Sequence, residues 1–275
     1  MDDVAIYNRE RWQALARANA VFTRAYLDLD TDSARAYLDP EGRLGDVAGK
    51  DVLCLAAGGG QQSVAFALLG AHVTVVDISE AQLQRDQAAA AHYHLKLDLI
   101  QGDMRDLARF GEDSFDIVWH PYSLNFVPDA RVVFHEVARV LRSGGIYHVM
   151  CANPFFMGLS RKDWDGAGYA LQLPYIDGAE ITYEDERWIY KGEQPAHAIK
   201  PPKEYRHTLD MLINGLIAQG FLILNVAEQH FGTPNATAEP GTPEHFTSVA
   251  PPWLTLWAAY RPDVLGSEGC AMEQE

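Results

Sequence analysis

Three consecutive glycines, Gly58, Gly59 and Gly60, stand two residues after a short apolar run at residues 52–55. Glycine lets a backbone turn sharply and lie close to a ligand. The apolar run is typical of a strand buried on both faces, and residues 61–69 have the apolar spacing of a helix. A strand, a glycine turn and a helix are typical of the nucleotide-binding half of a doubly wound fold, although such turns also join ordinary strands and helices.

An acid ends the next apolar run, which covers residues 72–76. Asp77 in that place can accept hydrogen bonds from both hydroxyls of a ribose. Ser79 follows as a predicted helix cap, with Gln82 at the capping-box position. The spacing therefore predicts that Asp77 lies at the end of a second strand, next to the glycine turn.

Further apolar runs alternate with helical patterns along the chain. The predicted strands cover residues 97–101, 115–119, 146–150, 221–226 and 253–260, and the predicted helices cover 132–141, ended by Gly144 and Gly145, and 208–219. This alternation predicts an α/β, Rossmann-like doubly wound sheet of seven strands with the last strand antiparallel. The loops after the parallel strands should gather at one edge, where such folds bind ligands.

The sequence resembles class I S-adenosylmethionine-dependent methyltransferases of the group called methyltransferase type 11. The resemblance is close over residues 51–152, and it rests on the later glycines of the first motif, on Asp77 and on Gly102-Asp103. The first motif of the family usually has an acid where this chain has Cys54 and a glycine where it has Ala56. The resemblance implies S-adenosyl-L-methionine as the cofactor.

The resemblance also implies which residues hold that cofactor. Asp77 would bind the ribose and Asp103 the adenine amino group, with Met104 beside it. The full predicted cofactor-binding set is Ala56, Gly58, Gly59, Gly60, Gln61, Asp77, Ile78, Gly102, Asp103, Met104 and His120.

Methyl transfer from a sulfonium needs an attacking atom in line with the sulfur–methyl bond. Proximity, orientation and exclusion of water supply most of the catalysis, and a base is needed only where the nucleophile must lose a proton. In the family the fourth strand ends near the transferable methyl, so His120 and Tyr122 are the predicted catalytic residues, His120 as the base. Asn125 is predicted to position the substrate. The alternative role of His120 is a structural hydrogen bond in its loop.

Two regions could cover the ligand-binding edge. Residues 4–26 read as a helix, and a short helix follows at 33–38. In the family that the sequence resembles, the lid over the cofactor lies in this region. The resemblance therefore implies that Tyr7 and Trp12 contact the substrate. Residues 152–206 fit no regular α/β unit and are rich in aromatic side chains. A connection of this length predicts an inserted cap after the fifth strand. Its predicted substrate contacts are Phe155, Trp164 and Trp188.

These regions define the expected domain organisation. Residues 1–45 form an N-terminal helical lid, residues 46–262 form the methyltransferase domain with its inserted cap, and residues 263–275 form a disordered tail. The Pro/Gly/Thr-rich stretch at 232–252 is expected to be a loop, with His245 exposed to solvent.

Composition limits the partners. The formal net charge of −16 disfavours nucleic acid backbones and anionic membranes. The three cysteines, Cys54, Cys151 and Cys270, have no metal-ligand spacing, so no metal site is predicted. No apolar run approaches the ~20 residues of a membrane span, and the N-terminus lacks the apolar core of a signal peptide. We expect a cytoplasmic methyltransferase that acts on a small molecule with an apolar or aromatic body; no oligomeric state is predicted.

Two other functions remain open from the residues. An NAD(P)-dependent oxidoreductase would use a similar glycine turn and Asp77, but Ser63 replaces its third glycine and no later Tyr-x-x-x-Lys pair follows. A non-catalytic, cofactor-binding interaction protein would account for the altered first motif at Cys54 and Ala56.

Overall fold

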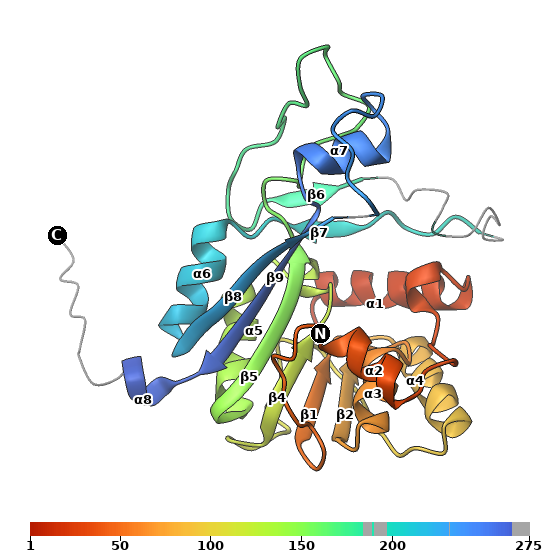
Figure 1. The fold of residues 1–275 in the computed structure, drawn as a ribbon, viewed down its shortest axis with the longest axis vertical. Helices are drawn as coiled ribbons and strands as arrows, with labels where there is room; N and C mark the ends of the chain where they lie inside the picture. The colour runs from red at the N-terminus through yellow and green to blue at the C-terminus, as the bar shows by residue number, and fades with distance from the viewer. Residues whose placement is uncertain (184–188, 190–196, 231, 266–275) are drawn as a thin grey trace.

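The structure is a computed structural model, and it describes residues 1–183, 189, 197–230 and 232–265. The strands are β1 (Asp51–Leu55), β2 (His72–Asp77), β3 (Asp98–Gln101), β4 (Phe115–His120), β5 (Leu141–Ala152), β6 (Glu180–Thr182), β7 (Lys203–Tyr205), β8 (Phe221–Gln229) and β9 (Trp253–Tyr260). Seven of them form one sheet in the order β3-β2-β1-β4-β5-β9-β8, while β6 and β7 form a separate two-stranded sheet (Figure 1).

The directions of the strands match the sequence prediction. β1 to β5 pair in parallel, whereas β9 lies between β5 and β8 and runs antiparallel to both. Strand β1, which lies between β2 and β4, is buried from Val52 to Leu55, as its continuous apolar run requires. The predicted seven-stranded α/β sheet with an antiparallel last strand is confirmed.

Helices cover both faces of the sheet. They are α2 (Thr31–Leu38), α3 (Gln62–Leu68) and α4 (Glu80–His92) on one face, and α5 (Ala130–Val140) and α6 (Leu209–Ala218) on the other. On α5 the buried residues Val133 and Val137 recur at the spacing of one helical face. Ser79 caps α4 by accepting a hydrogen bond from the Gln82 amide, as predicted.

Two predicted helix boundaries are wrong. The N-terminal helix α1 (Asp3–Arg17) ends well before residue 26, and a short 3-10 helix at Val21–Thr23 follows it. Helix α5 ends at Val140 rather than at the glycine pair, because Gly144 and Gly145 lie inside β5. A Cβ on Gly145 would stand 3.0 Å from the main-chain oxygen of Asp116, so glycine here serves the close approach of β5 to β4.

The cap contains β6 and β7 and is held together by a buried arginine. Arg206, which directly follows β7, is fully buried, and its guanidinium donates hydrogen bonds to the main-chain oxygens of Met157, Leu173 and Pro174. Burial lowers the pKa of Arg206 from its ordinary value. One cation therefore fixes three points of the chain between β5 and β6.

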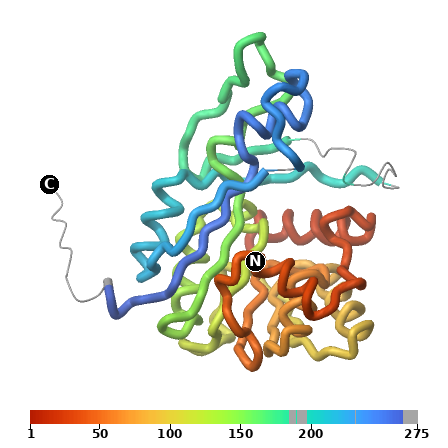
Figure 2. The backbone as a smooth tube through the Cα atoms, viewed as in Figure 1, coloured from red at the N-terminus to blue at the C-terminus, as the bar shows by residue number. Residues whose placement is uncertain are grey.

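A second segment joins the cap. The stretch at 232–252, predicted to be a loop, contains the helix α7 (Pro243–Val249). His245 on α7 is buried, not exposed as predicted, because its Nδ1 lies 2.9 Å from the hydroxyl of Tyr169 and its ring packs on Trp164. Figure 2 shows the chain that follows β5 and the chain that precedes β9 side by side at the top of the molecule.

The end of the described chain is the short helix α8 (Pro262–Leu265). The predicted tail therefore lies outside the described residues from position 266 onward. None of the helices in the described ranges is long and apolar enough to span a membrane.

Candidate functional site

The glycine turn joins β1 to α3 at the carboxyl edge of the parallel strands. Ala56, Gly59 and Gly60 have positive φ angles of 46°, 135° and 72°. A Cβ on Gly58 would lie 2.9 Å from the carboxyl carbon of Asp77, and a Cβ on Gly60 would lie 2.8 Å from a side chain of α4. The turn therefore fits tightly against β2 and α4 only with glycine at positions 58 and 60.

Asp77 brings three of the predicted cofactor-binding segments together. Its Oδ2 accepts a hydrogen bond from the Gly58 amide at 2.8 Å, and its Oδ1 accepts one from the Ser79 amide at 2.8 Å. Its main-chain oxygen accepts a third hydrogen bond from the Gly102 amide at 3.0 Å. Burial raises the pKa of the Asp77 carboxyl to about 6, although these side-chain hydrogen bonds lower it.

The end of β3 is tied to α1 by an arginine. Arg105 contacts Asp103 (Nη2 to Oδ2, 2.6 Å) and Asp2 (Nη1 to Oδ2, 2.8 Å), and Asp2 is the N-cap of α1. Asp103, the predicted adenine acid, is therefore charge-paired, and Met104 packs at the border of the core. The main-chain oxygen of Ile78 accepts a side-chain hydrogen bond from β3 at 3.1 Å.

The chain after α1 lies over the glycine turn. The side-chain amide of Gln61 donates hydrogen bonds to the main-chain oxygens of Phe22 (3.0 Å) and Arg24 (2.9 Å). The amide of Tyr26 donates to the main-chain oxygen of Gly60 at 2.9 Å. The N-terminal segment is thus attached directly to the turn, which is where a lid over the cofactor would have to lie.

His120 ends β4 and is fully buried. Its Nδ1 lies 2.9 Å from the hydroxyl of Tyr147 on β5, and its Nε2 has no hydrogen-bond partner among the described residues. Burial lowers the pKa of His120 to about 3, so the ring is neutral near pH 7 and accepts protons poorly. This geometry favours the structural role of His120 over that of a general base.

Tyr122 lies beneath the cap and contacts a buried acid. Cys54 on β1 is in register with Trp119 on β4, so the loop after β4 starts beside the glycine turn. The hydroxyl of Tyr122 donates to Oε2 of Glu204 at 2.8 Å, and the hydroxyl of Tyr183 in the cap donates to Oε1 at 2.8 Å. Glu204 is only 2% exposed, so a buried carboxylate and two phenols meet below the cap.

Two predicted substrate contacts lie on α1. The hydroxyl of Tyr7 donates to the main-chain oxygen of Pro201 at 2.9 Å. Trp12 meets Phe22 and Phe126 edge to face, with ring centroids 5.6 and 5.4 Å apart. In Figure 1, α1 lies between the β6–β7 pair and the ends of β1 and β2. Both side chains therefore connect the N-terminal helix to the cap side of the molecule.

The other predicted substrate contacts do not form one group. Asn125 is fully buried. Its Nδ2 donates a hydrogen bond to the main-chain oxygen of Tyr205 at 2.9 Å, and its Oδ1 accepts one from the main-chain amide of Ala152 at 2.7 Å. Phe155 is 52% exposed and stacks on another cap ring. Trp164 packs on α7, as described above, and Trp188 lies outside the described residues.

Asp86 and Glu204 are the site residues that the sequence analysis missed. Asp86 lies on the buried face of α4 together with Gln82, Leu83 and Ala89. An acid at a position that should be apolar was the signal that could have identified it. Glu204 lies in the three-residue strand β7, which is too short to show a periodic pattern, so nothing in the sequence marks it.

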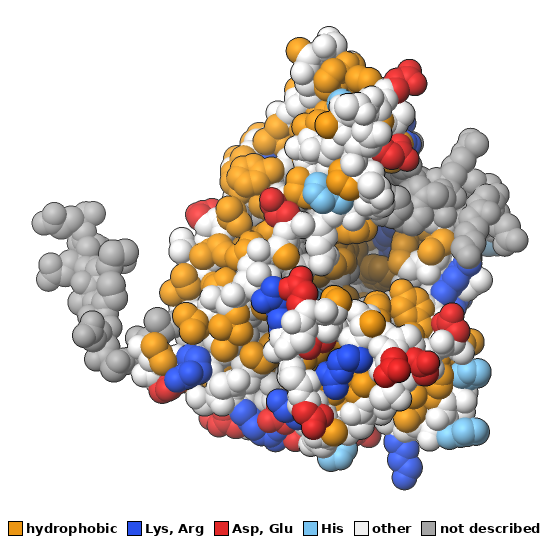
Figure 3. All heavy atoms as spheres, in the orientation of Figure 1, with side chains coloured by type: hydrophobic (Ala, Val, Ile, Leu, Met, Phe, Trp, Pro, Cys, Tyr) orange, Lys and Arg blue, Asp and Glu red, His pale blue; other side chains and the backbone are white. Residues whose placement is uncertain are grey.

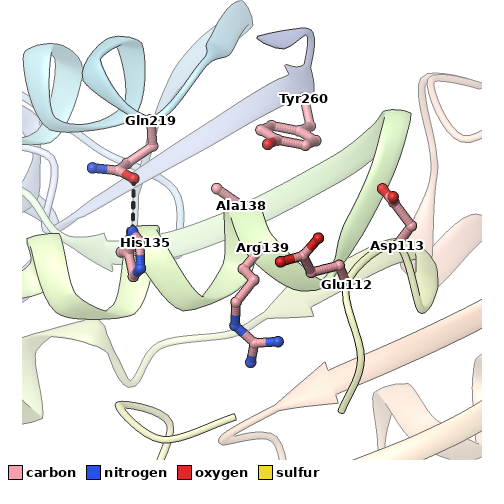
Figure 4. Close-up of a pocket in the computed structure, with 7 residues that line it drawn as sticks. All are labelled: Glu112, Asp113, His135, Ala138, Arg139, Gln219 and Tyr260. Atoms are coloured by element: carbon pink, nitrogen blue, oxygen red, sulfur yellow. Dashed lines mark hydrogen bonds between the residues drawn. The ribbon is translucent and has the colours of Figure 1, made fainter. Parts of the chain in front are cut away.

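A pocket elsewhere is not connected with this site. A cavity of about 300 Å³ is lined by residues that precede β4, belong to α5 or β9, or directly follow α6, as Figure 4 shows: Glu112, Asp113, His135, Ala138, Arg139, Gln219 and Tyr260. His135 and Gln219 contact each other across it at 3.2 Å. The pocket lies at the amino end of β4, whereas ligands of doubly wound sheets bind at the carboxyl ends.

Within the described residues, no group of His, Cys, Asp and Glu side chains could hold a metal ion.

The glycine turn has the wrong polarity for a dinucleotide. Its amides donate to carboxylates: Gly58 to Asp77, and Gly59 and Gly60 to Asp86. A pyrophosphate needs free amides at such a turn, and two acids behind the turn repel an anion. The same acids suit a ligand with cationic groups, such as the sulfonium and ammonium of S-adenosylmethionine.

Comparisons with known proteins agree with this polarity. A family model described as a methyltransferase domain matches residues 53–149. The uncharacterized methyltransferase YbaJ of Bacillus subtilis is 32% identical over 188 residues, which cover 68% of this chain and 71% of YbaJ. A ubiquinone biosynthesis O-methyltransferase of Marinobacter nauticus is 31% identical over 174 residues, which cover 61% of this chain and 69% of that protein.

Solved structures share the fold. An S-adenosylmethionine-dependent methyltransferase from Listeria monocytogenes superposes with a TM-score of 0.61 at 22% identity, covering 84% of this chain and 99% of that one. One from Mesorhizobium loti gives a TM-score of 0.59 at 23% identity, covering 85% of this chain and 100% of that one.

The sheet order and the site at its carboxyl edge define a class I methyltransferase. The chain belongs to the methyltransferase domain family and is an S-adenosylmethionine-dependent enzyme. The methyltransferase family inferred from the motifs is confirmed. The comparisons therefore favour a methyltransferase over the oxidoreductase and over the non-catalytic binding protein.

Proposed function

We propose that the enzyme methylates a small molecule with an apolar or aromatic body, held between α1, the loop after β4 and the cap. The buried acid Glu204 and its two phenol partners support this proposal, because they offer polar contacts within apolar surroundings. Similarity to a ubiquinone biosynthesis O-methyltransferase and to a demethylmenaquinone methyltransferase of Clavibacter sepedonicus also favours such an acceptor.

The cofactor would lie along the carboxyl edge of β1 to β4. Gly58 and Gly60 would lie against its methionine end, Asp77 would accept hydrogen bonds from the ribose, and Asp103 would face the adenine amino group. When bound, S-adenosylmethionine supplies an electrophilic methyl group on a sulfonium. The observation that carries this arrangement is the pair of buried carboxylates, Asp77 and Asp86, behind the glycine turn.

The N-terminal segment and the cap would exclude water from that edge. We assign residues 1–45 the role of a lid because Gln61 bonds the main chain at Phe22 and Arg24. Exclusion of water strengthens the electrostatic interactions within a site and lets orientation supply much of the rate.

Tyr122 and Glu204 would act on the acceptor. The phenol of Tyr122 would orient the nucleophile, and Glu204 would take a proton through that phenol where the nucleophile carries one. On this route the carboxylate of Glu204 is the proton acceptor. His120 is a poorer proton acceptor, because its burial lowers its pKa.

The surface charge favours a small molecule over nucleic acid. On the face drawn in Figure 3, Lys and Arg side chains stand singly or in small groups next to Asp and Glu side chains. The net charge of −16 also weakens binding of a negatively charged phosphate backbone. We therefore propose that neither nucleic acid nor a membrane surface is the substrate.

The cofactor arrangement is tested by replacing Asp77→Ala. Loss of charge-assisted hydrogen bonds worth roughly 1.5–3 kcal/mol each should weaken S-adenosylhomocysteine binding by about tenfold or more. The dissociation constant is measured by calorimetry, with circular dichroism to verify folding. Asp98→Ala is the matched control, because Asp98 is exposed at the opposite end of the neighbouring strand. Equal affinities of a folded Asp77→Ala protein and the control would contradict the assignment.

The acceptor site is tested by replacing Tyr122→Phe. Removal of the hydroxyl breaks the contact with Glu204, and we expect transfer to fall by about 100-fold, as for loss of a general acid or base. Labelled methyl transfer is measured on a panel of phenols, quinols and hydroxylated lipids, with RNA and peptides included. Tyr260→Phe at the opposite edge is the control. Transfer to RNA or peptide only, or an undiminished rate in Tyr122→Phe, would refute this part of the proposal.

A further inference from the structure

Asp86 is a buried acid behind the glycine turn, and the arrangement above gives it no contact with the cofactor itself. It stands in the middle of α4, is 0% exposed, and points into the turn that follows β1. Its Oδ2 accepts a hydrogen bond from the Gly59 amide at 2.8 Å, and its Oδ1 accepts one from the Gly60 amide at 3.0 Å. The hydroxyl of Ser63 also donates to Oδ1. A single side chain therefore satisfies three donors at the turn.

Cys54 on β1 lies close enough to Asp86 for the two groups to interact electrostatically. The thiol is fully buried, and burial, then the nearby charge of Asp86, raises its pKa well above the usual range. In the resembling family an acid usually stands at position 54, so the first strand here lacks that carboxylate. The charge of Asp86 on α4 acts on the Cys54 thiol of β1, so α4 supplies a carboxylate near this strand.

We propose that Asp86 is the positioning residue of the cofactor site, supplying from α4 the carboxylate that β1 lacks. It keeps the amides of Gly59 and Gly60 turned inward, in a backbone conformation with positive φ at both residues. Without an acceptor, these two amides would be buried and unpaired, and the turn would rearrange toward water. The inference rests on the proposed placement of the cofactor against this turn.

The third donor explains a departure from the dinucleotide pattern. Ser63 stands where a nicotinamide-binding motif has its third glycine, and its hydroxyl is used to hold Asp86. Ser63 and Asp86 therefore act as a pair, one from α3 and one from α4.

The test compares Asp86→Asn with Glu80→Gln, an exposed acid of the same helix. An amide at position 86 offers one acceptor where three donors converge, so we expect S-adenosylhomocysteine to bind about 10- to 100-fold more weakly, about 1.4 kcal/mol per tenfold. The KM for the cofactor should rise while the KM for the acceptor stays within about twofold, a split that general loss of structure would not produce. A folded Asp86→Asn protein with control-like affinity would overturn the inference.

A transplanted carboxylate gives a second test. In the double variant Cys54→Asp/Asp86→Ala the acid returns to β1, and we expect it to bind S-adenosylhomocysteine at least about tenfold better than Asp86→Ala. Binding as weak as that of Asp86→Ala would show that the two positions are not equivalent and would overturn the proposal. If Asp77→Ala leaves cofactor binding unchanged, the cofactor placement itself fails. If only Asp77→Ala weakens binding, the placement holds and the role of Asp86 alone is refuted.

Discussion

At the scale of single residues, Ala56 is the unusual member of the turn. Its φ of 46° lies in the left-handed region, which costs an L-residue roughly 1–2 kcal/mol. The family has glycine at this position, and glycine adopts the same conformation without a steric penalty. The turn therefore contains a strain that a single substitution could remove.

Ala56→Gly should raise the free energy of unfolding by about 0.5–1 kcal/mol, because relief of strain outweighs the added freedom of the unfolded chain. Urea denaturation measures the change. Ala57→Gly is the matched control, since Ala57 is buried at a φ outside the left-handed region and should lose about 1 kcal/mol. A loss of stability in Ala56→Gly equal to that of the control would mean that the φ of Ala56 carries no strain.

Whether a residue's contacts could be predicted depended on its position relative to the predicted strands. The placement of Asp77 next to Gly58 and Gly102 could be predicted, because each residue directly follows an apolar run and parallel strands end at one edge. The contacts of Asp86 and Glu204 could not be predicted, because Asp86 lies in the middle of α4 and Glu204 lies in the cap, so neither follows a strand of the parallel sheet. The polarity of Asp86 marks it as unusual on the buried face of α4, but it does not indicate which amides Asp86 binds. Only the folded chain shows such contacts.

At the scale of elements, an ion pair at the N-cap residue Asp2 holds the start of α1. Arg105 joins Asp2 to Asp103, and burial of the Asp103 half is greater than that of the Asp2 half. Exposed ion pairs contribute about 0.2–1 kcal/mol, so this contact should control local opening of α1 rather than global stability.

Arg105→Gln should make the amides of α1 exchange with solvent about twofold to fivefold faster, the effect of about 0.5–1 kcal/mol. Hydrogen exchange read by mass spectrometry on peptides from residues 1–17 measures it. Arg17→Gln is the control, because Arg17 bonds Gln13 on the same helix. Identical exchange in Arg105→Gln and the wild type would rule out the fastening role.

Element prediction failed where tertiary contacts decide. The glycines at 144 and 145 read as a helix stop, yet they lie within a strand because β5 must approach β4 closely. The helix α7 was missed since its stretch is rich in Pro, Gly and Thr, and its burial comes from Tyr169, far away in sequence.

At the scale of the whole molecule, the two buried acids make stability depend on pH. Burial raises the pKa of Asp77 to about 6 and that of Asp86 to about 7, both above their ordinary 3.8. Ser63 and the glycine amides lower the pKa of Asp86, while the charge of Asp77 raises it further. Both groups therefore bind protons more tightly in the folded state. Their contribution to stability is complete below about pH 4 and is lost as the pH rises through 6 and 7.

The free energy of unfolding should then fall by on the order of 1 kcal/mol per pH unit and acid, from about pH 4 to about pH 6 for Asp77 and to about pH 7 for Asp86. Binding of a cationic cofactor should offset part of this loss. Urea titrations at pH 5 and 8 compare the wild type with Asp86→Asn, which lacks one of the two titrating groups. The wild type should lose more stability over this range than the variant does. Equal losses would exclude Asp86 as a group that titrates there.

The position of β9 has a consequence for the order in which the protein is made. Ala152 at the end of β5 pairs with Trp253, and the cap residue Tyr169 pairs with His245, so both partners leave the ribosome long after β5 itself. Until then one side of β5 is an open strand edge, which can pair with another chain. Incomplete chains should therefore aggregate through β5. The cap should be the last part of the enzyme to assemble during synthesis.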